Sequence, residues 1–246
     1  MLDFFCRVEY NESAEVIMER TLFKRKEVKY LLDETTFRVL KEDFSPYLEE
    51  DDYPEYTICN LYFDTEDFDS IRTSRAKPSF KQKMRLRSYG IPDLSDGVFL
   101  ELKKKYEGIV YKRRIKAPYK EMLSYLDGGE LPVVGGSAAE IDYTRKRLNL
   151  SPKVYLAYDR IAFHGKEDTE LRVTFDHNVR YRLEDRFSFD GGKNVEEGYI
   201  MEVKTASPYP RWLLDCLERH KIYPRSYSKY SKVYEDILRE RKEKTV

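Results

Sequence analysis

The chain has 246 residues, of which 41% are hydrophobic and 37% are charged, with 45 basic and 45 acidic side chains. This balance excludes a nucleic-acid binder that acts through a general basic surface, so we expect no nucleic-acid partner. The cysteines Cys6, Cys59 and Cys216 are scattered without CxxC spacing, which argues against a disulfide framework or a zinc site. No apolar run approaches the roughly 20 residues that span a bilayer. We therefore expect a globular cytoplasmic protein without a membrane segment.

The first half of the chain predicts alternating strands and short helices. Residues 1–20 are weakly patterned, and we expect an N-terminal extension there. A strand at 21–30 precedes a helix at 34–47 with Asp33 as its N-cap. A strand at 56–65 leads into a short helix that ends near residue 72 and is capped by Asp64 or Thr65. Strands at 81–90 and 98–105 alternate with period two across a turn-rich segment, which predicts a hairpin.

The second half continues the pattern. A strand at 109–118 and a helix at 119–126 precede a helix that begins at Ser137, where Ser137 and Glu140 match a capping box. A strand at 153–165 is followed by residues 170–185, which predict a hairpin that turns near residues 176–178. A strand at 198–206, a helix capped by Ser207 and a final amphipathic helix at 226–244 complete the chain. No repeat or long linker divides it, so residues 1–246 are interpreted as one domain.

The predicted strands share one apolar face and one basic face. A single hairpin of this kind is more simply a sheet with one solvated face. The recurrence of the pattern in about eight strands changes this interpretation, because about eight strands can close into a barrel with a narrow bore. We therefore expect an α+β fold, a closed antiparallel barrel with the basic faces inward and the helices packed outside. The basic side chains on these faces are Lys29, Arg85, Arg87, Lys103, Lys105, Lys112, Arg114, Arg160, Arg172, Arg182 and Lys204.

So many cations around one bore would repel one another unless a polyanion neutralised them. A chain of phosphates fits this requirement, because arginine offers a planar fork and lysine a point charge to phosphate oxygens. The few acids on the same faces are Glu27, Glu101, Asp176 and Glu202. We expect such carboxylates to hold a divalent metal ion that bridges phosphates.

Seven motifs also carry a resemblance to a known family. They are RKEVKY, NLYFDT, MRLRSYG, LELKKK, YDRIAF, MEVKT and SYSKY, and they occur in this order between about residues 21 and 239. Together they resemble the VTC (vacuolar transporter chaperone) polyphosphate polymerase domain of the triphosphate tunnel metalloenzymes. The resemblance implies a tunnel that binds the triphosphate of ATP, uses Mn²⁺ or Mg²⁺, and passes a growing polyphosphate chain through its bore.

The resemblance also implies roles for individual residues. By motif, the catalytic phosphate-binding cations would be Lys29, Arg85, Arg87, Lys103, Arg160, Arg172 and Lys229. Glu202 would be the metal ligand. Further substrate contacts would come from Lys105, Lys112, Arg114, Tyr158, Lys204 and Lys232.

Three function classes stay open at this point. The related CYTH branch carries ExExK on its first strand, whereas Arg25 occupies the first acidic position here, which favours the VTC branch over a triphosphatase. A polymerase and a tripolyphosphatase or RNA triphosphatase differ only in whether a phosphate chain or water accepts the phosphoryl group. A polyphosphate-binding module without turnover is the third class. ATP and polyphosphate are the expected partners, and a membrane-protein partner is left open.

Overall fold

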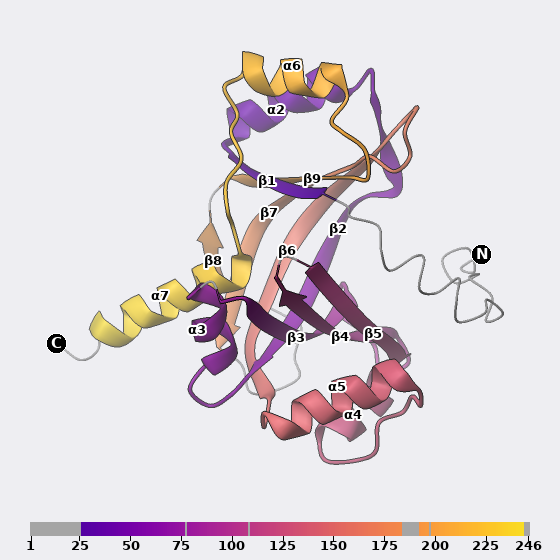
Figure 1. Cartoon of the computed structure of the whole chain (residues 1–246), viewed down its shortest axis with the longest axis vertical. Coiled ribbons are helices and arrows are strands. Elements are labelled where there is room, and N and C mark those ends of the chain that lie inside the picture. The colour runs from indigo at the N-terminus through magenta and orange to yellow at the C-terminus, as the bar shows by residue number, and fades with distance from the viewer. Residues whose placement is uncertain (1–25, 77, 108, 184–191, 197, 244–246) are drawn as a thin grey trace.

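The computed structural model describes residues 26–76, 78–107, 109–183, 192–196 and 198–243, so the predicted extension at residues 1–20 and the Arg25 position lie outside it (Figure 1). The first half of the chain contains β1 (Lys26–Leu32), α2 (Glu34–Phe44), β2 (Leu48–Asp64), α3 (Asp69–Arg75), β3 (Phe80–Tyr89), β4 (Gly97–Tyr106) and β5 (Ile109–Pro118). The second half contains α4 (Tyr119–Leu126), α5 (Gly136–Arg147), β6 (Ser151–Gly165), β7 (Arg172–Leu183), β8 (Lys193–Glu196), β9 (Tyr199–Thr205), α6 (Arg211–Arg219) and α7 (Lys229–Glu243).

The strands form one antiparallel sheet, which confirms the α+β class. Its order is β1-β9-β7-β6-β2-β3-β4-β5, with β8 paired to β7. The sheet is not closed, because β1 and β5 stay at its two ends without pairing among the described residues. The predicted closed barrel is therefore wrong. Beside β1, the backbone oxygen of Lys29 accepts a hydrogen bond from the amide of Arg225 at 2.8 Å, so the segment before α7 lies where β5 would close a barrel.

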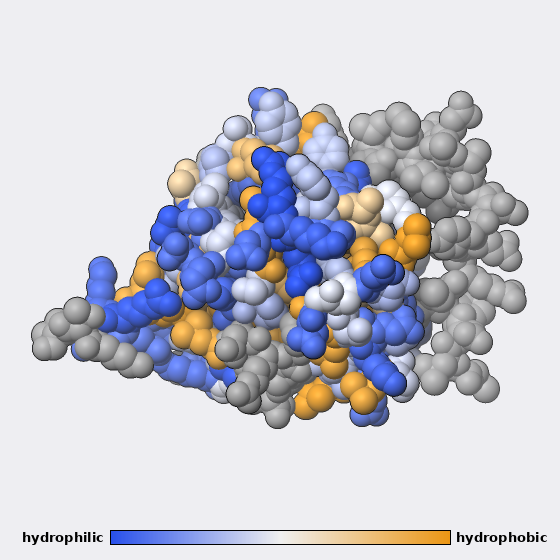
Figure 2. Space-filling view, turned by 90° about the horizontal axis from the view of Figure 1, so that it is seen from below, coloured by the Kyte–Doolittle hydropathy of each residue, from blue (hydrophilic) through white to orange (hydrophobic). Residues whose placement is uncertain are grey.

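Two helix pairs cover the outer, apolar face of the sheet (Figure 1). Helices α4 and α5 bury the outer side chains of β2 to β6, including Leu86 and Leu100. Helices α2 and α6 bury those of β1, β9, β7 and β6, including Val173 and Val203. The surface seen from the α4 and α5 end mixes hydrophilic and scattered apolar residues (Figure 2). No helix of the described chain combines the length and apolar character needed to cross a membrane.

Helix α7 lies on the other, inner face of the sheet. Its apolar side chains Tyr230, Val233 and Ile237 pack with inner residues such as Ile58 and Leu156 in one buried cluster. The same cluster contains α3 through Ile71. The expectation that all helices pack outside is therefore wrong for α7 and α3, which fill one end of the inner face. The polar part of the inner face lies next to this buried apolar cluster.

The predicted cap of α2 is confirmed. At α3 the N-cap position belongs to Phe68, but the predicted residues still bind the first helix amides from farther upstream. Asp33 is the N-cap of α2, where its carboxylate accepts the amide of Thr36 at 2.7 Å. Asp64 accepts the amides of Ser70 and Ile71 at the start of α3, and Thr65 accepts that of Asp69. These carboxylates and hydroxyls satisfy helix amides that have no partner within the helix.

Three local predictions are wrong. Helix α5 has Gly135 as its N-cap, and Ser137 lies inside the helix without a capping role. Helix α6 begins at Arg211 after Pro210, beyond the predicted cap at Ser207. Residues 172–183 form one strand, because Asn178 adopts a φ of 48° and makes a bulge while both halves pair with β6. This bulge turns Arg182 to the outer face, where its guanidinium lies 4.4 Å from the centre of the Tyr155 ring.

Candidate functional site

The polar part of the inner face is organised around carboxylates that each bind several cations. Glu101 on β4 is 3% exposed and accepts the guanidinium groups of Arg85 and Arg114, each Nε at 2.8 Å. Lys112 lies 2.8 Å and Arg87 3.8 Å from the same carboxylate. Burial alone would raise the pKa of Glu101, but the surrounding charges of Arg85, Arg87 and Lys112 hold this pKa far below its usual range.

Asp176 on β7 is the second shared carboxylate. It is fully buried and accepts both Nε and Nη2 of Arg160 on β6, at 2.6 and 2.8 Å. The ammonium group of Lys229, at the start of α7, binds the same carboxylate. Against the effect of burial, Lys229 and Arg160 lower the pKa of Asp176 strongly. The aromatic ring of Tyr158 lies beneath both cations, 4.3 Å from Lys229 and 5.4 Å from Arg160.

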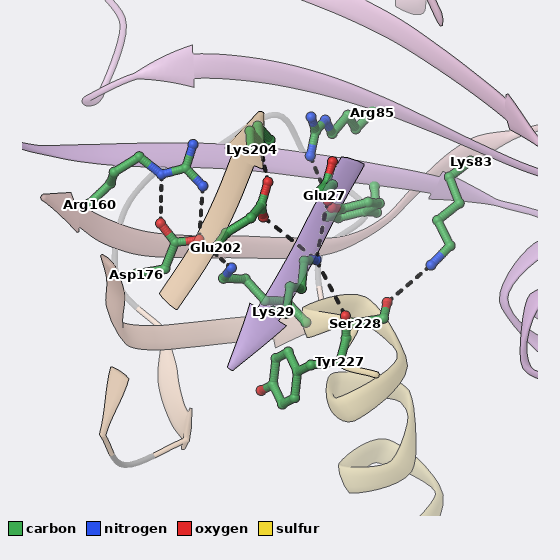
Figure 3. A network of polar contacts seen from close by, with 12 residues as sticks. Glu27, Lys29, Lys83, Arg85, Arg160, Asp176, Glu202, Lys204, Tyr227 and Ser228 are labelled. Carbon is green, nitrogen blue, oxygen red and sulfur yellow. Dashed lines mark hydrogen bonds and ion pairs between the residues drawn. The ribbon is translucent and has the colours of Figure 1, made fainter. Parts of the chain in front are cut away.

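Glu202 on β9 is the third shared carboxylate (Figure 3). One oxygen binds Lys204 at 2.6 Å and the other lies 3.7 Å from Lys29 on β1. Lys204 and Lys29 lower the pKa of Glu202 to about 2 although burial opposes the shift. Glu27 stands opposite Lys204 in the β1–β9 ladder and lies 3.8 Å from Lys29.

A row of lysines crosses the other half of the sheet. Lys83 on β3, Lys103 on β4 and Lys112 on β5 are direct neighbours in the ladders, and Lys81 faces Lys105 in the next row. Burial lowers the pKa of Lys83 to about 8, and the charges of nearby lysines, including Lys81, add to this effect. The row therefore concentrates positive charge, and Glu101 pairs with one of its members, Lys112, at 2.8 Å.

The segment before α7 joins the two halves of the site (Figure 3). Lys29 on β1 donates to the backbone oxygen of Tyr227 at 3.3 Å, and Lys83 on β3 donates to the hydroxyl of Ser228 at 3.1 Å. Lys229 then reaches Asp176 on β7. Lys29, Lys83 and Asp176, from three different strands, thus contact residues 227–229 where α7 begins. The structure therefore places Lys229 on the inner face, and its role in phosphate binding stays a prediction.

The structure brings most of the predicted site residues together. Lys29, Arg85, Arg87, Lys112, Arg114, Tyr158, Arg160, Glu202, Lys204 and Lys229 belong to the carboxylate clusters described above. Lys103 and Lys105 share their face. Arg172 lies at the rim, 49% exposed and 2.6 Å from Asp51. Lys232 is exposed on α7, one turn beyond Lys229.

Other residues of the site were not singled out from the sequence. Glu101 and Asp176 were expected as possible metal ligands among the few inward acids, and not as shared partners of the cations. Lys83 lies on the predicted strand at 81–90 but was not named. Asn60 accepts from Arg87 at 3.3 Å, and the hydroxyl of Tyr62 accepts from Arg85 at 3.2 Å. Strand parity places Asn60 and Tyr62 on this face, but their partners come from cross-strand register. The arginines of the inner face are also paired with buried carboxylates, whereas the sequence pattern suggested unpaired cations.

The carboxylates of the inner face suit a metal ion only together with phosphate oxygens. No three His, Cys, Asp or Glu ligands of the inner face come within bonding range of one cation in the described part of the chain. Mg²⁺-type ions are commonly held by one or two carboxylates plus phosphates and water. Glu202 and Glu27, on paired strands, match this requirement. Both oxygens of Glu202 already face lysines, so a metal ion would have to displace Lys204 from one of them.

Comparison with known proteins assigns the fold to a family. The model of the VTC domain family matches residues 24–237. The chain belongs to the VTC domain family. The vacuolar transporter chaperone complex subunit 4 of Schizosaccharomyces pombe is 26% identical over 151 residues, which cover 52% of this chain and 21% of that protein. This VTC domain thus spans about a fifth of the length of that relative.

One solved structure has a similar fold. A putative adenylate cyclase from Bacillus halodurans aligns with a TM-score of 0.54 at 16% identity, over 83% of this chain and 95% of that one. At this identity the likeness concerns the fold alone. It shows that the curled antiparallel sheet of this VTC domain recurs in a protein of different sequence.

Proposed function

We propose that this VTC domain is a metal-dependent polyphosphate polymerase that transfers the γ-phosphate of ATP to the end of an inorganic polyphosphate chain. The observation that carries the proposal is the excess of guanidinium and ammonium groups on the inner face over the few carboxylates they share. Such an excess suits a linear polyanion better than a singly charged ligand. The family membership and the relative named as subunit 4 of a vacuolar transporter chaperone complex support it.

The position of each cation on the inner face would determine which part of the substrate it binds. Arg85, Arg87 and Arg160 offer planar forks to the triphosphate, and the lysine row of β3 to β5 gives point charges along which a chain can lie. In the transfer, an oxygen at the chain end attacks the γ-phosphorus, the bond from this phosphorus to the β,γ-bridging oxygen breaks, and ADP leaves. Catalysis of this kind depends mainly on positioning and charge stabilisation, which fixed cations supply. A bound Mn²⁺ or Mg²⁺ would neutralise phosphate charge beside Glu202 and Glu27.

The proposal includes a cellular setting. The relative's name makes it part of a complex, and we propose that this domain works with partner proteins in the cytoplasm. ATP and polyphosphate are the proposed ligands, without a nucleic-acid partner.

Product analysis tests the function. Purified protein incubated with ATP and Mn²⁺ is expected to yield ADP and long phosphate chains, resolved on a gel and degraded by an added exopolyphosphatase. Orthophosphate as the sole phosphate product at every primer concentration would instead assign the domain to the hydrolases of the same fold. ATP left intact while polyphosphate binds would indicate a binding module.

Glu202→Gln tests the metal assignment. The amide keeps the shape of the side chain but loses the negative charge, so we expect turnover to fall below detection, while polyphosphate binding persists because Lys29 and Lys204 remain. Activity and the Mn²⁺ concentration for half-maximal rate are measured together. An active variant with an unchanged Mn²⁺ requirement would show that Glu202 does not hold the metal ion.

Lys83 makes phosphate binding depend on pH. Its pKa of about 8 means that the ammonium form, which attracts phosphate, is lost as the pH rises through 8. From pH 7 to pH 9 we expect the affinity for long polyphosphate to fall about 10-fold, because the protonated fraction of a group with a pKa of about 8 falls by this factor. Lys83→Arg stays charged and should show a smaller fall under the same titration. Equal falls in both proteins would assign the pH dependence to other groups.

A further inference from the structure

A second group of potential metal ligands lies on the opposite side of the sheet from the basic site. Asp43 in the last turn of α2 approaches Cys216 and His220 from the last turn and C-cap of α6. The thiol of Cys216 lies 3.4 Å and Nε2 of His220 lies 2.8 Å from the same oxygen, Oδ2 of Asp43. All three ligand atoms lie within 4.8 Å of one another. These two helices form the layer at the top of Figure 1, away from α7.

We propose that Asp43, Cys216 and His220 bind one Zn²⁺ ion, which links α2 to α6. The donor set of one thiolate, one imidazole and one carboxylate is the chemistry that zinc prefers. Tetrahedral bonds of about 2.3 Å to sulfur and about 2.0 Å to oxygen and nitrogen place sulfur about 3.5 Å from oxygen, and nitrogen about 3.3 Å from oxygen. The observed sulfur–oxygen separation of 3.4 Å is close to its value, whereas the nitrogen–oxygen separation of 2.8 Å is a hydrogen-bond distance that must lengthen by about 0.5 Å when zinc binds.

The helix geometry brings the ligands together and favours a cation. Cys216 and His220 are four residues apart, so they lie on one face of α6, the face that packs on α2. Both helices present their C-terminal turns here, and each C-terminus carries about half a negative charge. Asp43 adds a full negative charge in a last turn, where a carboxylate is unfavourable unless a cation compensates it.

The structure also identifies the competitor of the metal ion. Arg219 lies 3.3 Å from Oδ2 of Asp43, with its side chain 64% exposed. It can therefore swing into solvent when zinc arrives. Zinc binding then replaces the hydrogen bond from the Cys216 thiol to Asp43 by a zinc–sulfur bond, and the thiol proton passes to the solvent. One coordination position stays open to water, because three protein ligands are present.

Co²⁺ added to the metal-free full chain tests the site, because a thiolate ligand produces a near-ultraviolet charge-transfer band that oxygen ligands do not. We expect this band in the wild type, in Cys59→Ser, which removes the other buried thiol that the structure describes, and in Glu202→Gln. We expect its loss in Cys216→Ser. Zinc should displace Co²⁺ from the wild type.

Two substitutions of partly exposed residues separate ligation from folding. His220→Gln should weaken Co²⁺ and Zn²⁺ binding by about 100-fold or more, because a ligand is lost. Arg219→Ala should tighten binding, because it removes a competing cation without touching a ligand. Absence of the band in the wild type, its loss in Cys59→Ser but not in Cys216→Ser, or weaker binding in Arg219→Ala would overturn the proposal.

Discussion

Replacing Glu101 with glutamine is expected to lower the free energy of unfolding by about 2–4 kcal/mol. This carboxylate is 3% exposed and neutralises Arg85, Arg87, Lys112 and Arg114. Removing one member of a buried ion pair costs about 3–5 kcal/mol because the remaining charge is left uncompensated. The expected loss is about 1 kcal/mol smaller than this range, since Lys112 and Arg114 are partly in solvent. Urea unfolding followed by circular dichroism measures the change.

Glu140→Gln is the matched control. Glu140 also bridges two cations, Lys104 and Arg113, but on the outer face and with 30% of its side chain exposed. We expect a loss of about 0–1 kcal/mol for this variant. Polyphosphate should raise the melting temperature of Glu101→Gln more than that of the wild type, because phosphate replaces the missing negative charge. Equal losses in the two variants would contradict the central position of Glu101.

Replacing Arg85 with alanine is expected to reduce polyphosphate binding or turnover about 10- to 150-fold. A charge-assisted hydrogen bond contributes about 1.5–3 kcal/mol, which corresponds to this factor. Arg85→Lys keeps the charge but loses the planar fork, so an intermediate loss would show that geometry contributes. Steady-state kinetics with ATP and equilibrium binding of polyphosphate give the two values.

Stability distinguishes this role from a purely structural one. Glu101 keeps Arg114 and Lys112 when Arg85 is removed, so we expect the free energy of unfolding to change by less than about 1 kcal/mol. Arg113→Ala on the outer face of the same sheet should leave binding and turnover unchanged. A large loss of stability in Arg85→Ala with normal turnover would mean that Arg85 only anchors Glu101.

The alternation of the strands was sufficient to predict which side chains share the inner face. Period two follows directly from strand geometry, so Arg85 and Arg87 could be placed together before their partners were known. The bulge at Asn178 shows the limit of this rule, because one extra residue reversed the face of Arg182. The turn-forming character of residues 176–178 was real, but pairing of both halves with β6 overrode it.

The local sequence pattern could not predict whether the sheet closes into a barrel or which side chains form ion pairs. Whether β1 meets β5 depends on what occupies the space between them, and there the amide of Arg225 reaches the oxygen of Lys29. The amphipathic pattern of α7 gave its apolar stripe but not the face of the sheet that receives it. Likewise, Glu101 was predictable as an inward acid, whereas its sharing by four cations follows from the register of three strands.

The most direct test of the central claim is a crystal structure of the domain with a non-hydrolysable ATP analogue and Mn²⁺. The account predicts that the triphosphate lies on the inner face in contact with Arg85, Arg87 and Arg160, with Mn²⁺ between Glu202 and the phosphate oxygens. A triphosphate bound elsewhere, with these arginines still paired only to Glu101 and Asp176, would contradict it.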